Sequence, residues 1–278
     1  MPDYHALDPY TLRTFCSSYI MSTLVDNELR GRLALITGAS GGIGTAIARN
    51  LWAEGASLAL TSFRNPRAVE DLAKELLSQG GSGQKVSTHC VDTGSAEAIK
   101  RLFGDIKEQH GQDGPDILVS NAGYGKRYPG ISDVTLEEFD YTININLRAS
   151  FILSKLSIPH MEAQRWGRVI FISSIAAQGG GINACHYAAS KAGLSGMMKN
   201  LANKHAGFGI TVNDVAPAMI GETGMIPDAK FVEGTPGDVK NIPVGRLGTP
   251  QECANVVTMI CKTGYLTGQS ILLSGGLR

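Results

Sequence analysis

Short apolar runs alternate with segments of helical periodicity along the chain from residue 32 onward. The apolar runs are continuous, as in LALI at 33–36, which is typical of strands buried on both faces of a parallel sheet. Several of the intervening segments begin at proline or end at glycine, as helices commonly do. The pattern predicts strands at 32–38, 56–62, 85–92, 115–123, 167–174, 210–217 and 269–276, and helices at 43–55, 66–81, 95–111, 135–161, 185–207 and 249–262.

This regular alternation predicts an α/β fold. We expect one Rossmann-type, doubly wound parallel sheet of about seven strands with helices on both faces, because parallel strands need crossover connections that cover the sheet. A length of 278 residues and a hydrophobic content of 43% suit one large domain, which we place at 31–278. Residues 219–246 are rich in glycine and proline, and a long irregular segment of this kind often forms a lid.

The first 30 residues differ in character and form an N-terminal extension, 1–30. No acidic residue lies between 11 and 25, and apolar side chains recur there at helical spacing. These apolar residues are Leu12, Phe15, Cys16, Tyr19 and Ile20. Two interpretations stay open: an amphipathic arm that packs on the body or on a partner subunit, and a mitochondrial targeting segment.

Composition excludes several classes of function. Lysine plus arginine and aspartate plus glutamate are balanced at 25 each, so no general attraction to nucleic acid or to anionic membranes is expected. No apolar run reaches the roughly 18 residues that a membrane span needs. The five cysteines are scattered, which favours a reducing compartment such as the cytoplasm over a disulfide framework. The six histidines lack metal-binding spacings, so we expect no metal site.

A glycine-rich turn follows the first predicted strand. The segment TGASGGIG at 37–44 carries Gly38, Gly42 and Gly44 and opens the first predicted helix. Glycines in this context allow a tight turn and a close approach of the backbone to a pyrophosphate, which the helix N-terminus attracts. Glycines also serve ordinary turns, but the strand-turn-helix context predicts dinucleotide binding.

The end of the second predicted strand bears on the choice of cofactor. A carboxylate there would bind a ribose 2′-hydroxyl and repel a 2′-phosphate. Ser62 occupies that place and Arg64 follows, and a hydroxyl and a guanidinium suit a phosphate better. We therefore expect NADP(H) in preference to NAD(H), the alternative being that Arg64 is a solvated turn residue. Asp92, after the third strand, is placed to approach the adenine or to lie near a helix N-terminus.

Tyr187 and Lys191 lie four residues apart in the helix predicted at 185–207 and therefore share one face. A free phenol has a pKa near ~10, and a neighbouring ammonium lowers it toward the range useful for acid–base catalysis. A surface pair without a chemical role is the alternative. Ser174, at the end of a strand, could hold a substrate carbonyl beside the phenol. Asn146 is unfavourable inside a helix, which indicates another task for its amide.

Together these motifs resemble the short-chain dehydrogenase/reductase family. The resemblance covers roughly 33–276 and rests on several motifs in the order typical of that family. They are Thr37-Gly-x-x-x-Gly-Ile-Gly, Asp92, Asn121-Ala-Gly, Asn146, Ser174, Tyr187-x-x-x-Lys191 and Pro217. The resemblance implies an NAD(P)-dependent oxidoreductase with one Rossmann-type domain, and a homo-oligomer, a dimer or tetramer, built on the long helices.

Roles for individual residues follow from the resemblance. It implies that Tyr187 is the acid–base group, that Ser174 polarises the carbonyl, and that Lys191 lowers the pKa of the tyrosine and binds the nicotinamide ribose. Asn146 would hold a water that connects the lysine to bulk solvent. The implied cofactor-binding residues are Gly38, Ser40, Gly42, Ile43, Gly44, Ser62, Arg64, Asp92, Thr93, Asn121, Ala122, Gly123, Tyr187, Lys191, Pro217, Ile220 and Thr223.

Within the family the chain is most similar to β-ketoacyl-acyl-carrier-protein reductases. We therefore expect an NADPH-dependent carbonyl reductase that acts on a small-molecule ketone such as a 3-oxoacyl thioester. The alternatives are a secondary-alcohol dehydrogenase acting on a polyol, sugar or steroid, and a non-catalytic nucleotide-sensing protein. Gly41 stands where many NADP-dependent members carry an arginine. Arg165 matches one of two arginines that contact the acyl carrier, but Phe208 occupies the place of the other, so an acyl-carrier partner stays open.

Overall fold

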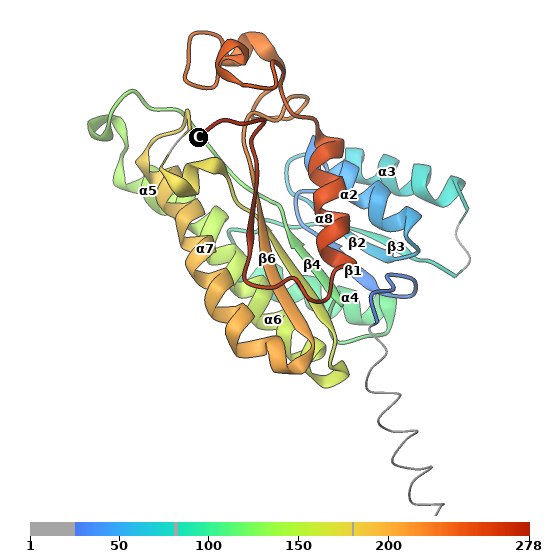
Figure 1. The fold of residues 1–278 in the computed structure, drawn as a ribbon. Helices are drawn as coiled ribbons and strands as arrows, with labels where there is room; N and C mark the ends of the chain where they lie inside the picture. The colour runs from blue at the N-terminus through green and yellow to red at the C-terminus, as the bar shows by residue number, and fades with distance from the viewer. Residues whose placement is uncertain (1–25, 81–82, 180) are drawn as a thin grey trace, which may run out of the picture.

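The computed structural model describes residues 26–80, 83–179 and 181–278. Seven parallel strands form one sheet in the order β3-β2-β1-β4-β5-β6-β7 (Figure 1). The strands are β1 Leu33–Ile36, β2 Ser57–Ser62, β3 Val86–Cys90, β4 Ile117–Ser120, β5 Gly167–Ile172, β6 Ile210–Pro217 and β7 Ser270–Leu273. Each lies within its predicted range, and the sheet confirms the predicted fold class.

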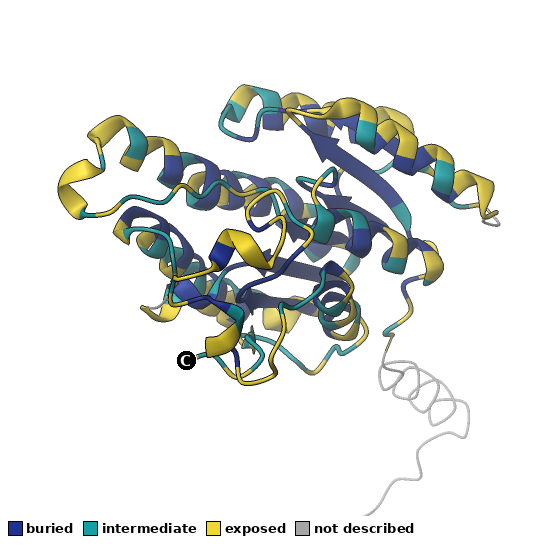
Figure 2. Cartoon of the chain, turned by 90° about the horizontal axis from the view of Figure 1, so that it is seen from above, coloured by how far each residue is buried: buried dark blue, intermediate teal, exposed yellow. Residues whose placement is uncertain are grey.

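Helices cover both faces of the sheet. The helices are α2 Gly42–Ala53, α3 Pro66–Ser78, α4 Ala96–His110, α5 Leu136–Ile143, α6 Ala149–Gln164, α7 Cys185–His205 and α8 Pro250–Cys261. One apolar core packs α2, α3 and α8 on the first face, and a second core packs α4, α6 and α7 on the other. Alternate residues of β1 enter the two cores: Ala34 and Ile36 the first, Leu33 and Leu35 the second. Figure 2 shows the buried strands between helices that expose only their outer sides.

Local sequence determines where several helices start and stop. Asn65 caps α3 by accepting a hydrogen bond from the backbone N–H of Ala68, and Pro66 occupies the first helical position. Thr249 and Glu252 form a reciprocal capping box at the start of α8. Gly111 ends α4 in the left-handed conformation with φ +78°, which glycine adopts without steric penalty.

The order of the strands creates a crevice at the centre of the sheet. The chain begins at β1, moves outward to β3, and then returns to the other side of β1 at β4. Connections from β1 and β4 therefore diverge to opposite faces, which opens a crevice beyond the carboxyl ends of these two strands. Ligands of doubly wound sheets bind at such a switch point. The glycine-rich turn after β1 and the segment after β4 both lie there.

The single helix predicted at 135–161 is interrupted. Residues 136–143 form α5, Asn144–Arg148 form a π-helical segment (η2), and α6 continues to Gln164. Asn146 lies in η2, where the wider turn lets its amide bond to a neighbouring loop rather than to its own helix. The apolar periodicity was sufficient to predict the helix, but it carries no information on the local change in winding.

The segment 219–246 has little regular structure and lies beyond the carboxyl ends of the strands, at the top of Figure 1. It contains two short 3-10 helices, η5 Ala229–Val232 and η6 Val239–Asn241. Met219, Ile226, Val232 and Ile242 form a small apolar cluster of their own. This cluster gives the segment an internal core that is separate from the two cores of the sheet.

The amphipathic stretch predicted at 12–20, within the extension 1–30, lies outside the described residues, which begin at 26. In the described part of the chain, none of the helices is both long enough and apolar enough to cross a bilayer. The same part contains no cluster of three or more histidine, cysteine, aspartate or glutamate side chains that could hold a metal ion.

Candidate active site

The glycine-rich turn is sterically constrained. Gly38 has φ +65°, and a Cβ added there would lie 2.9 Å from the Cα of Ala122. A Cβ on Gly44 would lie 2.5 Å from the carbonyl oxygen of Gly38. Among the described residues no side chain caps the start of α2, so its first backbone N–H groups can bind an anion. The residues after β1 thus form the tight backbone cradle that a dinucleotide pyrophosphate requires.

A threonine that sequence reasoning did not include among the site residues connects β1 to β4. Thr37 Oγ1 accepts hydrogen bonds from the backbone N–H groups of Asn121 and Ala122, both at 3.0 Å. The Asn121 amide donates in return to the carbonyl oxygens of Thr37 at 2.9 Å and Gly38 at 3.1 Å. These four hydrogen bonds join the carboxyl end of β1 to the carboxyl end of β4 at the crevice. The signal in the sequence was a threonine directly before the first glycine.

Polar groups gather at the end of β2. The hydroxyls of Ser40 and Ser62 lie 2.9 Å apart, and Arg64 follows on an exposed turn. An Arg64 Nη2 group donates to the Tyr141 hydroxyl on α5 at 3.4 Å. The Asp92 carboxylate instead accepts the backbone N–H of Gly94 at 2.9 Å, in the turn before α4. Two hydroxyls and a guanidinium therefore lie at the end of β2 without a carboxylate on that strand end.

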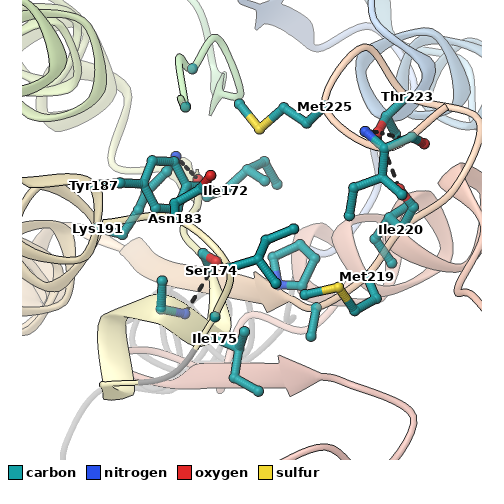
Figure 3. A pocket seen from close by; sticks show the side chains of 18 of the residues that line it. Ile172, Ser174, Ile175, Asn183, Tyr187, Lys191, Met219, Ile220, Thr223 and Met225 are labelled. Atoms are coloured by element: carbon teal, nitrogen blue, oxygen red, sulfur yellow. Dashed lines mark hydrogen bonds between the residues drawn. The ribbon is translucent and has the colours of Figure 1, made fainter. Parts of the chain in front are cut away.

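Ser174, Tyr187 and Lys191 line one pocket of about 380 Å³ at the carboxyl edge of the sheet (Figure 3). Ser174 follows β5, and the other two residues lie on consecutive turns of α7. The Lys191 ammonium donates to the carbonyl oxygen of Ile172 at 2.9 Å and lies 5.7 Å from the ring centroid of Tyr187. Both side chains are buried, with exposed fractions of 5% for Tyr187 and 4% for Lys191. They are therefore not a surface pair.

Asn146 connects three elements around this pocket. Its Oδ1 accepts the backbone N–H of Tyr124 at 2.7 Å, and its Nδ2 donates to the Tyr124 carbonyl at 2.9 Å. The same Nδ2 donates to the Ser190 hydroxyl at 2.9 Å, and Ser190 donates to the Tyr187 carbonyl at 2.7 Å. A Cβ on Gly123 would lie 3.4 Å from Lys191 Nζ, so the loop after β4 passes close to the ammonium.

Burial changes the proton affinities of the pair. It raises the pKa of Tyr187, and the Ser174 hydroxyl opposes this shift only in part. Burial lowers the pKa of Lys191 to about 8, against the opposing effect of the Asp214 carboxylate. The lowered pKa expected for Tyr187 is therefore not found in the protein by itself: the pKa lies above that of a free phenol, because desolvation of the phenolate is the largest effect on it. At neutral pH the phenol holds its proton and the ammonium holds its charge.

The remainder of the pocket is mostly apolar. Its walls include Ile175, Ile182, Met219, Met225, Ile226 and Phe231. The predicted residues Pro217, Ile220 and Thr223 also line it, and Thr223 Oγ1 donates to the Ile220 carbonyl at 3.1 Å. Sequence reasoning missed these apolar walls because they belong to irregular segments, where no periodicity distinguishes a pocket side chain from a loop side chain.

Arg127 connects the loop after β4 to the segment 219–246. Its guanidinium lies 4.3 Å from the ring centroid of Phe231, and Nη1 donates to the Phe231 carbonyl at 3.1 Å. Both residues line the pocket, so the two irregular segments meet beside it. Sequence analysis did not single out either residue.

A doubly wound parallel sheet with a glycine cradle, and with a buried tyrosine, lysine and serine at its carboxyl edge, defines an NAD(P)-dependent oxidoreductase. The sequence profile of the short chain dehydrogenase family matches residues 32–230. The chain belongs to this family.

Curated relatives and solved structures agree with this assignment. The chain is 38% identical to the 3-oxoacyl-[acyl-carrier-protein] reductase FabG of Escherichia coli over 90% of its own length and 98% of that protein. It is 34% identical to human dehydrogenase/reductase SDR family member 4, covering 90% of the chain and 88% of the relative. A metagenomic blue fluorescent protein solved in complex with NADPH matches with a TM-score of 0.81 and 32% identity, over 90% of this chain and 99% of that one.

Proposed function

We propose that this protein is an NADPH-dependent carbonyl reductase that reduces a ketone, and that the preferred substrate is a 3-oxoacyl thioester. The observation that carries the proposal is the buried Tyr187–Lys191 pair beside Ser174 at the base of an apolar pocket. Reduction of a ketone needs a proton donor for the developing alkoxide, and a buried, protonated phenol supplies one. Similarity to 3-oxoacyl reductases supports the substrate.

Each polar residue has a distinct task in this proposal. When bound, the reduced nicotinamide supplies a hydride to the carbonyl carbon. Ser174 donates a hydrogen bond to the carbonyl oxygen, and Tyr187 transfers its proton to that oxygen as negative charge develops. The Lys191 ammonium stabilises the tyrosinate that remains. Asn146 maintains the geometry of the loop after β4 and holds the water through which the pair regains a proton.

The residues at the crevice support a dinucleotide with a 2′-phosphate. Gly38, Ser40, Gly42, Ile43 and Gly44 would hold the pyrophosphate and the adjoining ribose. Ser40, Ser62 and Arg64 would bind the 2′-phosphate, since hydroxyls and a guanidinium are good phosphate partners and no carboxylate on the end of β2 opposes it. Asp92 and Thr93 would lie beside the adenine. Asn121, Ala122, Gly123, Pro217, Ile220 and Thr223 would contact the nicotinamide half.

The same similarity raises the question of an acyl carrier. Arg165 is exposed, but it donates to the Gly207 carbonyl at 2.9 Å and its guanidinium lies 6.0 Å from the Phe208 ring. A carrier with acidic contacts would find one arginine here rather than two. We therefore propose that a soluble thioester is accepted without a strict need for a carrier protein.

We also propose that the protein forms a homo-oligomer. Large apolar side chains on α5 and α6 are exposed, among them Leu136, Phe139 and Phe151, and a homodimer or homotetramer would bury them.

The segment 219–246 would act as a lid over the pocket. Residues 1–30 would be an N-terminal extension to the catalytic domain. The scattered cysteines favour the cytoplasm, and mitochondrial targeting through the extension is the alternative.

The proposal is tested by following the oxidation of NADPH and NADH at 340 nm with a panel of ketones. The panel contains an acetoacetyl thioester, a simple diketone, a steroid ketone and a ketose. We expect the highest rate with NADPH and the thioester, and a loss of about 10²–10⁴-fold in kcat for Tyr187→Phe. Tyr124→Phe is the matched control, because its hydroxyl contacts Glu138 at 3.4 Å outside the pocket. Activity with a sugar or steroid alone would indicate the alcohol-dehydrogenase alternative. A Tyr187→Phe variant as active as the wild type would refute the mechanism.

A further inference from the structure

A buried carboxylate bonds to Ser173, one of the residues that line the pocket of the candidate active site. Asp214 lies on β6, and its exposed fraction is 0%. Its Oδ1 accepts hydrogen bonds from the Ser173 hydroxyl at 2.6 Å and the Ser270 hydroxyl at 2.7 Å, and its Oδ2 accepts one from Ser195 at 3.4 Å. Both short distances are within the range of hydroxyls that donate to a carboxylate. Three neutral hydroxyls solvate this charge but do not neutralise it.

Lys191 is a buried charge of the opposite sign. Its ammonium donates to the carbonyl oxygen of Ile172, and in the part of the chain that the structure describes it forms no ion pair with any carboxylate. An isolated buried ammonium is strongly disfavoured relative to the neutral amine. A carboxylate close by, even without direct contact, stabilises the charged form because the interior screens the attraction weakly.

The backbone places these two charges around the same strand end. Lys191 bonds to Ile172, and Asp214 bonds to Ser173, the next residue of the chain. Ser195 lies one helical turn after Lys191 on the same side of α7 and reaches the same carboxylate. The end of β5 is thus bonded to the lysine at one residue and to the aspartate at the next, immediately before Ser174.

We infer that Asp214 is a positioning residue that holds Lys191 in its ammonium form and, through it, adjusts the acid strength of Tyr187. The inference rests on the proposed function, since it concerns the same catalytic pair. Of the charged groups in the described part of the chain, Asp214 is the one that shifts the pKa of Lys191 upward, while burial lowers that pKa to about 8.

The surroundings of Lys191 contain few other titratable groups. Tyr187 is the titratable neighbour on α7. The hydroxyls of Ser173, directly after β5, and of Ser270 on β7 bond to Asp214. His186 is oriented toward α5 instead, where its Nε2 lies 3.8 Å from Glu138 Oε1. The η2 segment and the loop after β4 present the neutral groups Asn146 and Gly123, and two charged side chains of that loop, Lys126 and Arg127, line the same pocket. A change in the charge at position 214 therefore acts chiefly on the Tyr187–Lys191 pair.

Removal of the negative charge of Asp214 should lower the pH at which the Tyr187–Lys191 pair loses a proton. Lys191 is charged below its pKa and neutral above it, and loss of the nearby anion lowers that pKa further. Loss of the anion also favours ionisation of Tyr187. Whichever member of the coupled pair releases its proton first, the pair deprotonates at a lower pH. Because reduction requires the phenol and the ammonium, activity then declines at a lower pH than in the wild type.

The first measurement is the pH dependence of kcat/KM for ketone reduction in wild type and Asp214→Asn. Asparagine has the same shape and can still accept hydrogen bonds, but it carries no charge. We expect the alkaline limb to move to lower pH by about one unit or more. Asp116→Asn is the matched control: this aspartate is also buried, but it accepts the Leu33 N–H at 2.7 Å at the opposite end of the sheet. Its alkaline limb should stay in place. If Asp214→Asn does not fold, Asp214→Ser takes its place.

A second measurement needs no substrate. Competitive labelling with acetic anhydride, read out on the Lys191 peptide by mass spectrometry, reports the pH at which this amine becomes reactive. A lower midpoint in Asp214→Asn than in wild type and Asp116→Asn supports the inference. Equal midpoints and equal alkaline limbs in all three proteins overturn it. If wild type reduces no ketone of the panel and the Lys191 midpoint still shifts, the proposed function fails while the link between Asp214 and Lys191 stands.

Discussion

The Asn146 side chain bonds to both backbone groups of Tyr124, accepting its N–H at 2.7 Å and donating to its carbonyl at 2.9 Å. This pairing resembles one step of a sheet ladder, made by a side chain in place of a strand. It holds the loop after β4 against η2 and, through Ser190, against α7. A residue within the π-helical segment therefore connects the loop after β4 to α7, and both of these line the pocket.

Replacement of Asn146 should affect both stability and catalysis. Asn146→Ala leaves the backbone groups of Tyr124 without their side-chain partners, and each buried group left unpaired costs about 1–3 kcal/mol. We expect a lower free energy of unfolding in urea and a lower kcat. Asn144→Ala is the control, since Asn144 lies in the same segment but donates to the Gly94 carbonyl outside the pocket. Equal effects of the two substitutions would show that Asn146 has no special role.

Arg64 should determine the preference for NADPH. A charge-assisted hydrogen bond to a phosphate contributes about 1.5–3 kcal/mol, so Arg64→Ala should raise the KM for NADPH by about 10–100-fold. The KM for NADH should change little. Arg67→Ala tests an equally exposed arginine at the start of α3 and should leave both values unchanged. If both arginine variants bind NADPH as the wild type does, the 2′-phosphate is held elsewhere.

Ser62→Asp should reverse the preference for cofactor. A carboxylate at the end of β2 can accept a hydrogen bond from a ribose 2′-hydroxyl but repels a 2′-phosphate. We expect kcat/KM to fall for NADPH and to rise for NADH, measured with the same ketone. A parallel decrease for both cofactors would instead indicate general damage to the loop that holds Ser40 and Ser62.

Steric constraint at Gly38 can be separated from backbone strain. Gly38→Ala places a Cβ 2.9 Å from Ala122 Cα and also forces alanine into φ +65°. Gly111→Ala shares a positive φ, +78°, but its Cβ would have no atom of the described residues within 4 Å. Left-handed backbone costs roughly 1–2 kcal/mol for alanine, so the Gly111 variant should lose about that much stability. Gly38→Ala should lose more and should also bind NADPH more weakly, as measured by urea unfolding and fluorescence titration.

The stability of the folded protein should decrease at acid pH because of a partly buried histidine beside the edge strand β3. The hydroxyl of Ser87 lies 2.7 Å from Nε2 of both His89 and His110, and burial lowers the pKa of His110 to about 4. The unfolded chain therefore binds a proton at this histidine between about pH 6.5 and pH 4, whereas the folded protein does not. Stability should fall as the pH falls through this window. His110→Gln should show a smaller decrease in melting temperature between pH 7 and pH 5, and an unchanged decrease would exclude this origin.

Some residues of the site could be predicted from the sequence, and others are brought together only by the fold. Tyr187 and Lys191 were predictable because helical periodicity places residues four apart on one face, whatever the rest of the fold does. Ser174 and the glycine-rich turn were predictable because both follow strands, and parallel strands end at one edge of the sheet. Arg127 and Phe231 were not, since 104 residues separate them and each lies in an irregular segment.

The sequence by itself determined the order of strands and helices, the parallel sheet, and the residues that local spacing brings to its carboxyl edge. Apolar periodicity and helix caps depend on residues that are only a few positions apart, so they can be recognised in the sequence. Only the tertiary structure decided that burial raises the pKa of Tyr187 and that the Asp214 carboxylate raises the pKa of Lys191 against the effect of burial. Desolvation and charge–charge interaction depend on distances between segments far apart in the chain, and no local pattern encodes those distances.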